Sequence, residues 1–230
     1  MSDINKVFEY VLDTETTGFY PETGDKLVEI GIIEICDRFP TGKEFHHLIN
    51  PLRNIPQSST NIHGITDEDV QDKPIFDKIA QDFLDFIGDG RLVIHNASFD
   101  MKFLNTELKL HGYKEIPMER CIDTIEIAKK VFPGAQINLD ALCKKLNINN
   151  SSRVTHGALI DAKLLSEVYI ALTGGRQGSL HLKKNSHSSR IEKNTSDIYS
   201  ERSKRVIFAS TEELKDHHCF LKNNVPNTFW

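Results

Sequence analysis

The pattern of apolar and polar positions predicts strands first and then alternating strands and helices. Apolar residues fill both sides of residues 7–15 and 26–37, which is typical of buried strands, and a third strand is expected at 44–51. Short turns separate these segments, so we expect an antiparallel meander. The later segments are predicted as a helix within 74–90, a strand at 91–96, a helix at 98–112, a strand at 121–124, short helices at 124–132 and 138–148, and a long helix within 156–175.

This order of elements indicates an α/β fold in which helices flank a mixed sheet. Charge then divides the chain: residues 1–175 hold 18 Lys and Arg against 27 Asp and Glu, whereas residues 176–230 hold 10 against 6. The change follows a glycine-rich stop at residues 173–179 and opens a polar stretch with few apolar residues. We therefore predict one domain of ordinary size at 1–175, a flexible linker at 176–200 and a C-terminal tail at 201–230.

Composition narrows the possible classes of protein. The formal charge of −5 does not suit a basic nucleic-acid coat, and no apolar run approaches the ~20 residues that cross a bilayer. The first ten residues lack the pattern of a signal peptide, and the four cysteines form no CxxC pair. We expect a cytoplasmic protein with reduced thiols and no membrane partner.

Acidic residues stand where apolar residues belong. Asp13 and Glu15 follow a buried strand and, because side chains alternate, project to one face. Asp100 lies in the first turn of a predicted helix, and Asp161 interrupts the apolar face of another. His156 approaches Asp161 only if it occupies the loop before that helix. Each signal has a plain alternative: solvated acids at a strand end, an acid favoured by the helix dipole, or a capping histidine beside an incidental acid.

Taken together, these side chains predict a site for divalent cations. Two carboxylates ~5–7 Å apart repel each other unless a cation lies between them or one takes a proton. Hard oxygen ligands without cysteine suit Mg²⁺ or Mn²⁺. Two such ions about 3.5–4 Å apart can hold a phosphodiester for attack by water, and a histidine can take the proton from that water.

Three motifs carry a resemblance to a known family: "DTETTG" at 13–18, "HNASFD" at 95–100 and "HGALIDA" at 156–162. They resemble the DEDD exonuclease superfamily in its histidine branch. The similarity extends over roughly residues 6–177 and is greatest to the proofreading exonucleases of bacterial replicative polymerases. It implies a ribonuclease-H-like fold, 3′–5′ hydrolysis of DNA that releases 5′-mononucleotides, and two Mg²⁺ or Mn²⁺ ions.

The resemblance also assigns roles to residues. It makes Asp13, Glu15, Asp100 and Asp161 metal ligands and His156 the general base. Substrate-binding positions are Asp13, Glu15, Asp161 and His63, although His63 also fits a helix-cap role. Asn96 is expected to support a turn, and Ser58 stands where relatives are expected to carry an acid, so no role is assigned to it.

The tail resembles two kinds of binding segment. "QGSLHL" is similar to peptides that bind the sliding clamp, through Gln177, Leu180 and Leu182, and its alternative is plain linker. Residues 204–221 and the final "NTFW" resemble the part that docks on the polymerase (alpha) subunit, with Phe208 and Trp230 as apolar anchors. The alternative is a tail that folds back on its own core. The resemblance also allows a small theta-like accessory subunit.

Three functions stay open at this point. The first is a proofreading exonuclease acting on DNA 3′ ends, and the second is a ribonuclease of the same branch that trims RNA 3′ ends. The third is a non-catalytic adaptor between clamp and polymerase. The tail favours the first over the second, and the complete set of five chemical groups argues against the third.

Overall fold

The computed structural model describes residues 7–151, 153, 155–174 and 210–224. Its sheet has five strands in the order β3-β2-β1-β4-β5. The first three strands pair antiparallel, and β4 pairs parallel with both β1 and β5. The predicted meander and mixed sheet are thereby confirmed. The strands are β1 (Phe8–Thr16), β2 (Leu27–Cys36), β3 (Phe39–Leu48), β4 (Arg91–Ile94) and β5 (Cys121–Asp123).

Helices follow the sequence pattern except between Pro51 and Pro74, where none was expected. Two short helices, α1 (Gln57–His63) and α2 (Asp67–Val70), occupy that stretch. They are too short and polar to show a helical apolar stripe. The remaining helices are α3 (Phe76–Ile87), α4 (Ala97–Leu110), α5 (Thr124–Val131), α6 (Leu139–Leu146), α7 (Ala158–Leu172) and α8 (Thr211–Asn224), with 3-10 turns at η1 (Pro21–Thr23) and η2 (Met118–Arg120).

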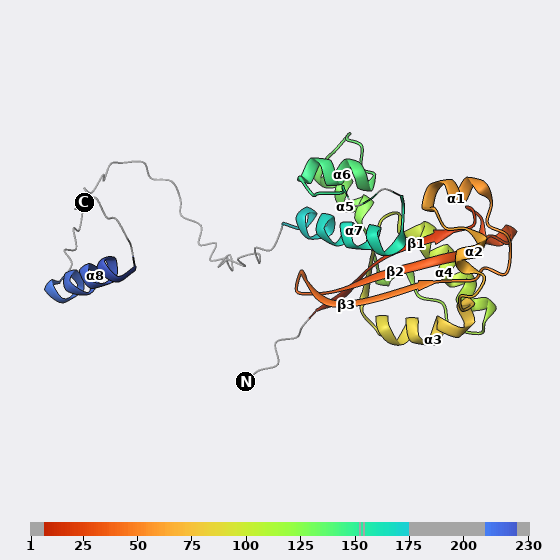
Figure 1. Ribbon diagram of the computed structural model, residues 1–230, viewed down its shortest axis with the longest axis horizontal. Coiled ribbons are helices and arrows are strands. Elements are labelled where there is room, and N and C mark those ends of the chain that lie inside the picture. The colour runs from red at the N-terminus through yellow and green to blue at the C-terminus, as the bar shows by residue number, and fades with distance from the viewer. Residues whose placement is uncertain (1–6, 152, 154, 175–209, 225–230) are drawn as a thin grey trace, which may run out of the picture. The chain divides into compact units, whose positions relative to one another are not determined.

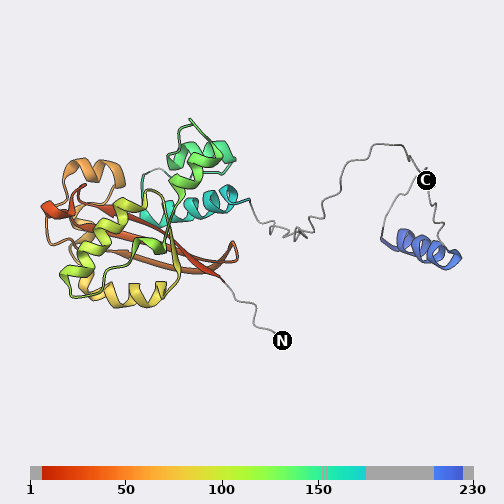
Figure 2. The same cartoon turned by 180° about the vertical axis from the view of Figure 1, so that it is seen from behind.

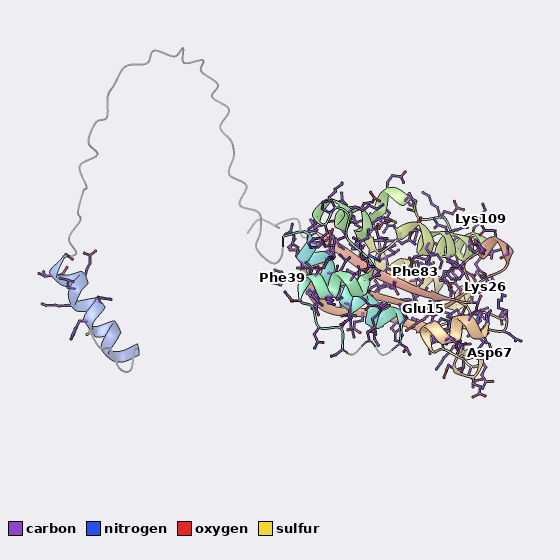
Figure 3. All side chains as sticks on the ribbon, turned by 90° about the horizontal axis from the view of Figure 1, so that it is seen from above. Glu15, Lys26, Phe39, Asp67, Phe83 and Lys109 are labelled. Atoms are coloured by element: carbon purple, nitrogen blue, oxygen red, sulfur yellow. The ribbon has the colours of Figure 1, made fainter. Side chains whose placement is uncertain are left out.

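Two hydrophobic clusters cover the two faces of the sheet. Because side chains alternate along β1, Leu12 joins the cluster beneath α3 and α4, whereas Val11 joins the one beneath α5, α6 and α7. Figures 1 and 2 show the two helical layers from opposite sides. In Figure 3, the buried Phe83 of α3 lies among the elements of residues 7–174, and the exposed Asp67 lies at the edge of this unit. The odd-numbered positions of β1 therefore face α7.

Gly31 of β2 allows α7 to approach the sheet closely. A β-carbon built at this position would lie 2.3 Å from the backbone nitrogen of Leu159 and 2.4 Å from the carbonyl carbon of Ala158. Gly31 is the direct cross-strand partner of Asp13. The close approach thus brings the first turn of α7 over the part of β1 that carries the acids.

The chain divides into two compact units, residues 1–181 and 182–230, and α8 belongs to the second. Within α8, Leu214 is 55% exposed. The predicted clamp-binding residues Gln177, Leu180 and Leu182, and the predicted anchors Phe208 and Trp230, lie outside the described residues. Among the helices that the structure describes, none has the length and apolar character required to span a bilayer.

Candidate active site

Asp13 and Glu15 lie near the end of β1, on the face toward α7. Glu15 is 9% exposed and pairs across the sheet with Glu29 of β2. The strand register shifts between Glu15 and Thr16, and the chain then turns away. Both carboxylates therefore project from the last paired residues of β1, just before the chain leaves the sheet.

Asp100 reaches the same region from α4. This helix begins after Asn96, a non-glycine residue with φ of 71°, and Asp123 of β5 accepts the backbone N–H groups of Asn96 and Ala97. Ser98 lies inside α4, and its hydroxyl donates to Asn96 Oδ1 at 3.2 Å. Asp100 is 3% exposed and accepts a 2.7 Å hydrogen bond from the Thr14 hydroxyl.

Asp161 and His156 come from the start of α7. The first helical N–H, that of Ala158, donates to the Glu29 carboxylate at 2.9 Å. Asp161 is buried in the first turn, whereas the side chain of His156, in the preceding loop, is 47% exposed. His156 Nδ1 lies 3.3 Å from Asp161 Oδ2, so the loop position expected from the spacing does bring the two together.

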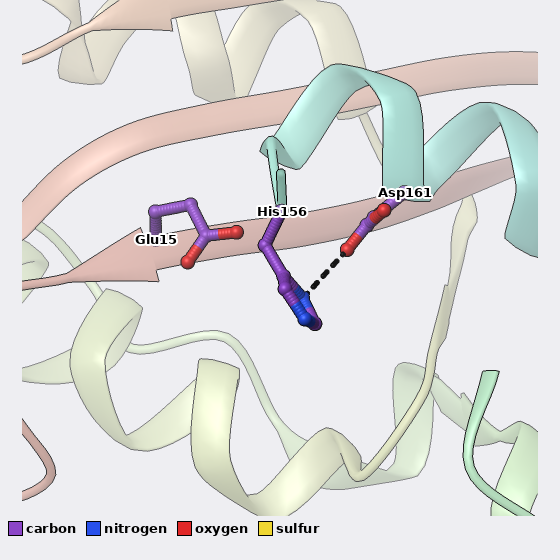
Figure 4. A group of neighbouring side chains, drawn as sticks. All are labelled: Glu15, His156 and Asp161. Carbon is purple, nitrogen blue, oxygen red and sulfur yellow. Dashed lines mark ion pairs between the residues drawn. The ribbon is translucent and has the colours of Figure 1, made fainter. Parts of the chain in front are cut away.

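Ligand atoms of Glu15, His156 and Asp161 all lie within 4.8 Å of one another. Figure 4 shows the His156 ring between the two carboxylates, with its pair to Asp161 dashed. One strand and one helix start thus meet in a cluster of oxygen and nitrogen donors.

The carboxylates repel one another in a buried setting. Burial, followed by the charges of Asp100, Glu15 and Asp161, raises the pKa of Asp13 well above its usual range. Burial and the charges of Asp161, Glu29 and Asp100 raise the pKa of Glu15 to about 8.

The pKa of Asp100 is also raised by burial, and one hydrogen bond partly opposes this rise. Burial raises its pKa to about 7, although the hydrogen bond from Thr14 acts in the opposite direction. Such a set of acids resists ionisation until positive charge arrives, and carboxylate oxygens are the donors that Mg²⁺ and Mn²⁺ prefer. The residues present therefore fit a divalent-cation site.

The structure adds an arginine that sequence reasoning missed. Arg153 donates through Nε and Nη2 to the two oxygens of Asp161, at 2.6 and 2.7 Å. Its side chain is only 7% exposed. The charge itself gave no signal, because a lone arginine in a polar loop before "HGALIDA" is ordinarily read as solvated.

An exposed aromatic group in the turn after β1 was also missed. Phe19, in the turn that follows Glu15, is 65% exposed, and its ring lies edge-on to Phe99 of α4 with centroids 6.3 Å apart. Tyr20 beside it is 59% exposed. The signal available in the sequence was a pair of consecutive aromatic residues directly after "DTETTG".

His63, at the end of α1, is buried near this cluster. The hydroxyl of Ser59, one turn earlier, donates to the carbonyl of Thr17 and so joins α1 to the end of β1. The N–H of Ile65 donates to His63 Nδ1 at 3.0 Å. Its Nε2 is buried without a hydrogen-bond partner in the described structure. Ser58, by contrast, is exposed.

A buried cluster of acids with a histidine at the end of a mixed sheet defines a metal-dependent hydrolase of ribonuclease-H-like architecture. A family model described as Exonuclease matches residues 10–169. Among solved structures, the nuclease domain of 3′hExo, a DEDDh family member bound to rAMP, aligns with a TM-score of 0.64 at 18% identity and covers 76% of this chain and 96% of its own. Exonuclease X, in complex with 5′ overhanging duplex DNA, aligns at 0.58 and 28% identity, over 72% and 90%.

Curated relatives narrow the class further. The DNA polymerase III subunit epsilon of Rickettsia felis is 47% identical over 94% of this chain and 96% of the relative. That of Escherichia coli is 40% identical over 93% and 91%. The chain belongs to the exonuclease family and, within it, to the epsilon subunits of DNA polymerase III. It is a 3′–5′ exonuclease of the proofreading type, as the motifs predicted.

Proposed function

We propose that this chain hydrolyses the terminal phosphodiester of a DNA 3′ end with two divalent ions held by Asp13, Glu15, Asp100 and Asp161. The observation that carries the proposal is the convergence of Glu15, His156 and Asp161 donor atoms within 4.8 Å, beside two further acids whose pKa values are raised. When bound, Mg²⁺ or Mn²⁺ supplies Lewis acidity at the phosphate and lowers the pKa of water.

His156 serves as the general base. Its side chain is half exposed in the loop before α7, where water can reach it, and it adjoins Asp161. A neutral imidazole can take the proton from an attacking water, and the neighbouring Asp161 carboxylate stabilises the imidazolium that results. The base is therefore supplied by this chain beside the carboxylates that would hold the divalent ions.

His63 contributes to substrate binding. Because Ile65 donates to Nδ1, the neutral ring carries its proton on Nε2, which has no hydrogen-bond partner of good geometry among the described residues, although the backbone of Thr16 lies close to the ring. Burial also lowers the pKa of His63, which favours the neutral form. A buried donor without a partner costs about 1–3 kcal/mol, so an oxygen of the terminal nucleotide is a suitable acceptor. This supports the substrate role that the resemblance implied.

Mismatch preference follows from fraying rather than from base reading. A mispaired end unpairs more readily, and a single strand can stack its bases on exposed aromatic groups such as Phe19. The net charge of −5 argues against tight binding of duplex DNA by this chain alone. Nanomolar binding of primer-template by the isolated chain at physiological salt would contradict this part.

The partners are proposed from the relatives and the sequence. The chain acts in the cytoplasm within a polymerase complex, residues 1–175 carry the hydrolysis, and residues 201–230, with Phe208 and Trp230, dock on the polymerase subunit. Residues 176–200 link the two, and Gln177, Leu180 and Leu182 contact the sliding clamp. Deletion of residues 183–230 should spare hydrolysis and abolish the complex, whereas Gln177→Ala with Leu182→Ala should lower clamp binding only.

Nucleotide release from a 3′-mismatched DNA primer tests the proposed function. The intact chain should release 5′-mononucleotides with Mg²⁺ or Mn²⁺, EDTA should stop the release, and Asp13→Ala should abolish it. Glu126→Gln, an exposed acid on α5 paired with Lys129, is the matched control and should keep full activity. Faster release from a matched RNA oligonucleotide would favour an RNA-trimming enzyme. No release from the DNA or the RNA oligonucleotide would favour the non-catalytic adaptor.

A further inference from the structure

Arg153 makes a dense set of contacts at the proposed metal site. Besides its two bonds to Asp161, its Nη1 lies 2.6 Å from Asp140 Oδ2, and its Nη2 lies 2.7 Å from His156 Nδ1. A guanidinium with a side chain 7% exposed thus bridges three acidic or basic groups. A planar fork bound to both oxygens of one carboxylate is among the stronger polar contacts in proteins.

The contact with His156 determines which nitrogen of that ring carries the proton. A guanidinium donates and never accepts, so Nδ1 must be the acceptor of the bond from Arg153. The 3.3 Å approach of Nδ1 to Asp161 is then not a hydrogen bond, because neither atom carries a proton for it. In this arrangement the lone pair on Nδ1 is occupied by Arg153 and the neutral ring carries its proton on Nε2.

Asp140 supplies a second anchor for the same guanidinium. It lies in the first turn of α6, its side chain is 56% exposed, and it also accepts a 3.0 Å hydrogen bond from Asn150. This carboxylate stands apart from the cluster formed by Glu15, His156 and Asp161. Arg153 can therefore lose Asp161 and still keep an ionic partner.

We propose that Arg153 is a positioning residue that competes with the divalent cation for Asp161, and that Asp140 retains the guanidinium once it is displaced. The proposal rests on the metal-binding role of Asp161 given above. A cation that engages the Asp161 oxygens must break bonds from Arg153, and movement of the guanidinium toward Asp140 also releases His156 Nδ1. Metal binding and release of the general base are thereby coupled through one side chain.

Binding of Mn²⁺ to the intact chain, followed by electron paramagnetic resonance of the free ion, tests the competition. Arg153→Gln should lower the Kd for Mn²⁺ by about tenfold, since it removes the competing cation. Asp140→Asn should raise the Kd, because the displaced guanidinium then lacks its anchor. Arg53→Gln is the control: Arg53 pairs with Asp25 at 3.0 Å and contacts none of the site carboxylates, so the Kd should not change.

Opposite shifts from two neighbouring residues would not arise from a merely structural role. An unchanged or higher Kd in folded Arg153→Gln overturns the proposal, and so does a Kd unaffected by Asp140→Asn. If Arg153→Gln fails to fold in EDTA, the Mn²⁺ Kd of Asp140→Asn, a substitution at an exposed side chain, decides the proposal by itself. Failure of the wild-type chain to bind Mn²⁺ would instead remove the proposed function together with this inference.

Discussion

Replacing Glu15 with Gln should stabilise the protein without divalent ions and weaken its response to them. Burial and three neighbouring acids raise the pKa of Glu15 from 4.5 to about 8. Between these two pH values the folded chain holds a proton that the unfolded chain releases, so stability falls as pH rises through this window and levels off above about pH 8. At ~1.36 kcal/mol per unit, the full shift corresponds to at most about 5 kcal/mol.

Urea unfolding followed by circular dichroism at pH 8 measures this effect. In EDTA, Glu15→Gln should be more stable than wild type by about 2–4 kcal/mol, because the amide carries no charge to bury. With Mn²⁺ at about 100 times its Kd, wild type should gain about 2.7 kcal/mol and the variant clearly less. The exposed control Glu126→Gln should change neither value. Equal or lower stability of Glu15→Gln in EDTA would refute the account of a strained acidic cluster.

Three further substitutions test other parts of the site. Thr14→Val removes the 2.7 Å hydrogen bond that lowers the pKa of Asp100. The acid limb of the plot of kcat against pH should therefore move to higher pH, and an unchanged limb would contradict this role. Gly31→Ala should destabilise the fold by roughly 2–4 kcal/mol in thermal unfolding because its new β-carbon meets the backbone of α7, whereas Gly157→Ala, with its nearest atoms at 3.9 Å, should cost much less. Phe19→Ala should weaken single-stranded DNA binding by about 1–3 kcal/mol in fluorescence anisotropy, with kcat little changed; full retention of affinity would exclude stacking on this ring.

The sequence predicted the parts of the fold that repeat. Apolar runs identified β1, β2 and β4, and helical spacing identified α3, α4 and α7, because each element buries a continuous face. The helices α1 and α2 escaped notice because their stability depends on contacts from outside, such as the bond from Ser59 to Thr17. The start of β3 at Phe39 was also missed, since its first six residues are exposed and show no alternation of apolar and polar positions.

The site followed a similar division. Asp13, Glu15, Asp100, His156 and Asp161 could be proposed because acids on apolar faces conflict with burial unless a cation compensates them. Arg153 could not, because its importance lies in three partners that are brought together only by packing of α6 and α7. The local sequence thus shows which acidic residues occupy positions that should be apolar. Only the tertiary structure shows which positively charged side chain pairs with them.

Anomalous diffraction from crystals grown with Mn²⁺ and a 5′-mononucleotide tests the central proposal most directly. Two manganese peaks should lie among the oxygens of Asp13, Glu15, Asp100 and Asp161, in contact with the nucleotide phosphate, with His156 beside them. Peaks elsewhere on the molecule, or a nucleotide bound with no manganese at these carboxylates, would contradict the account.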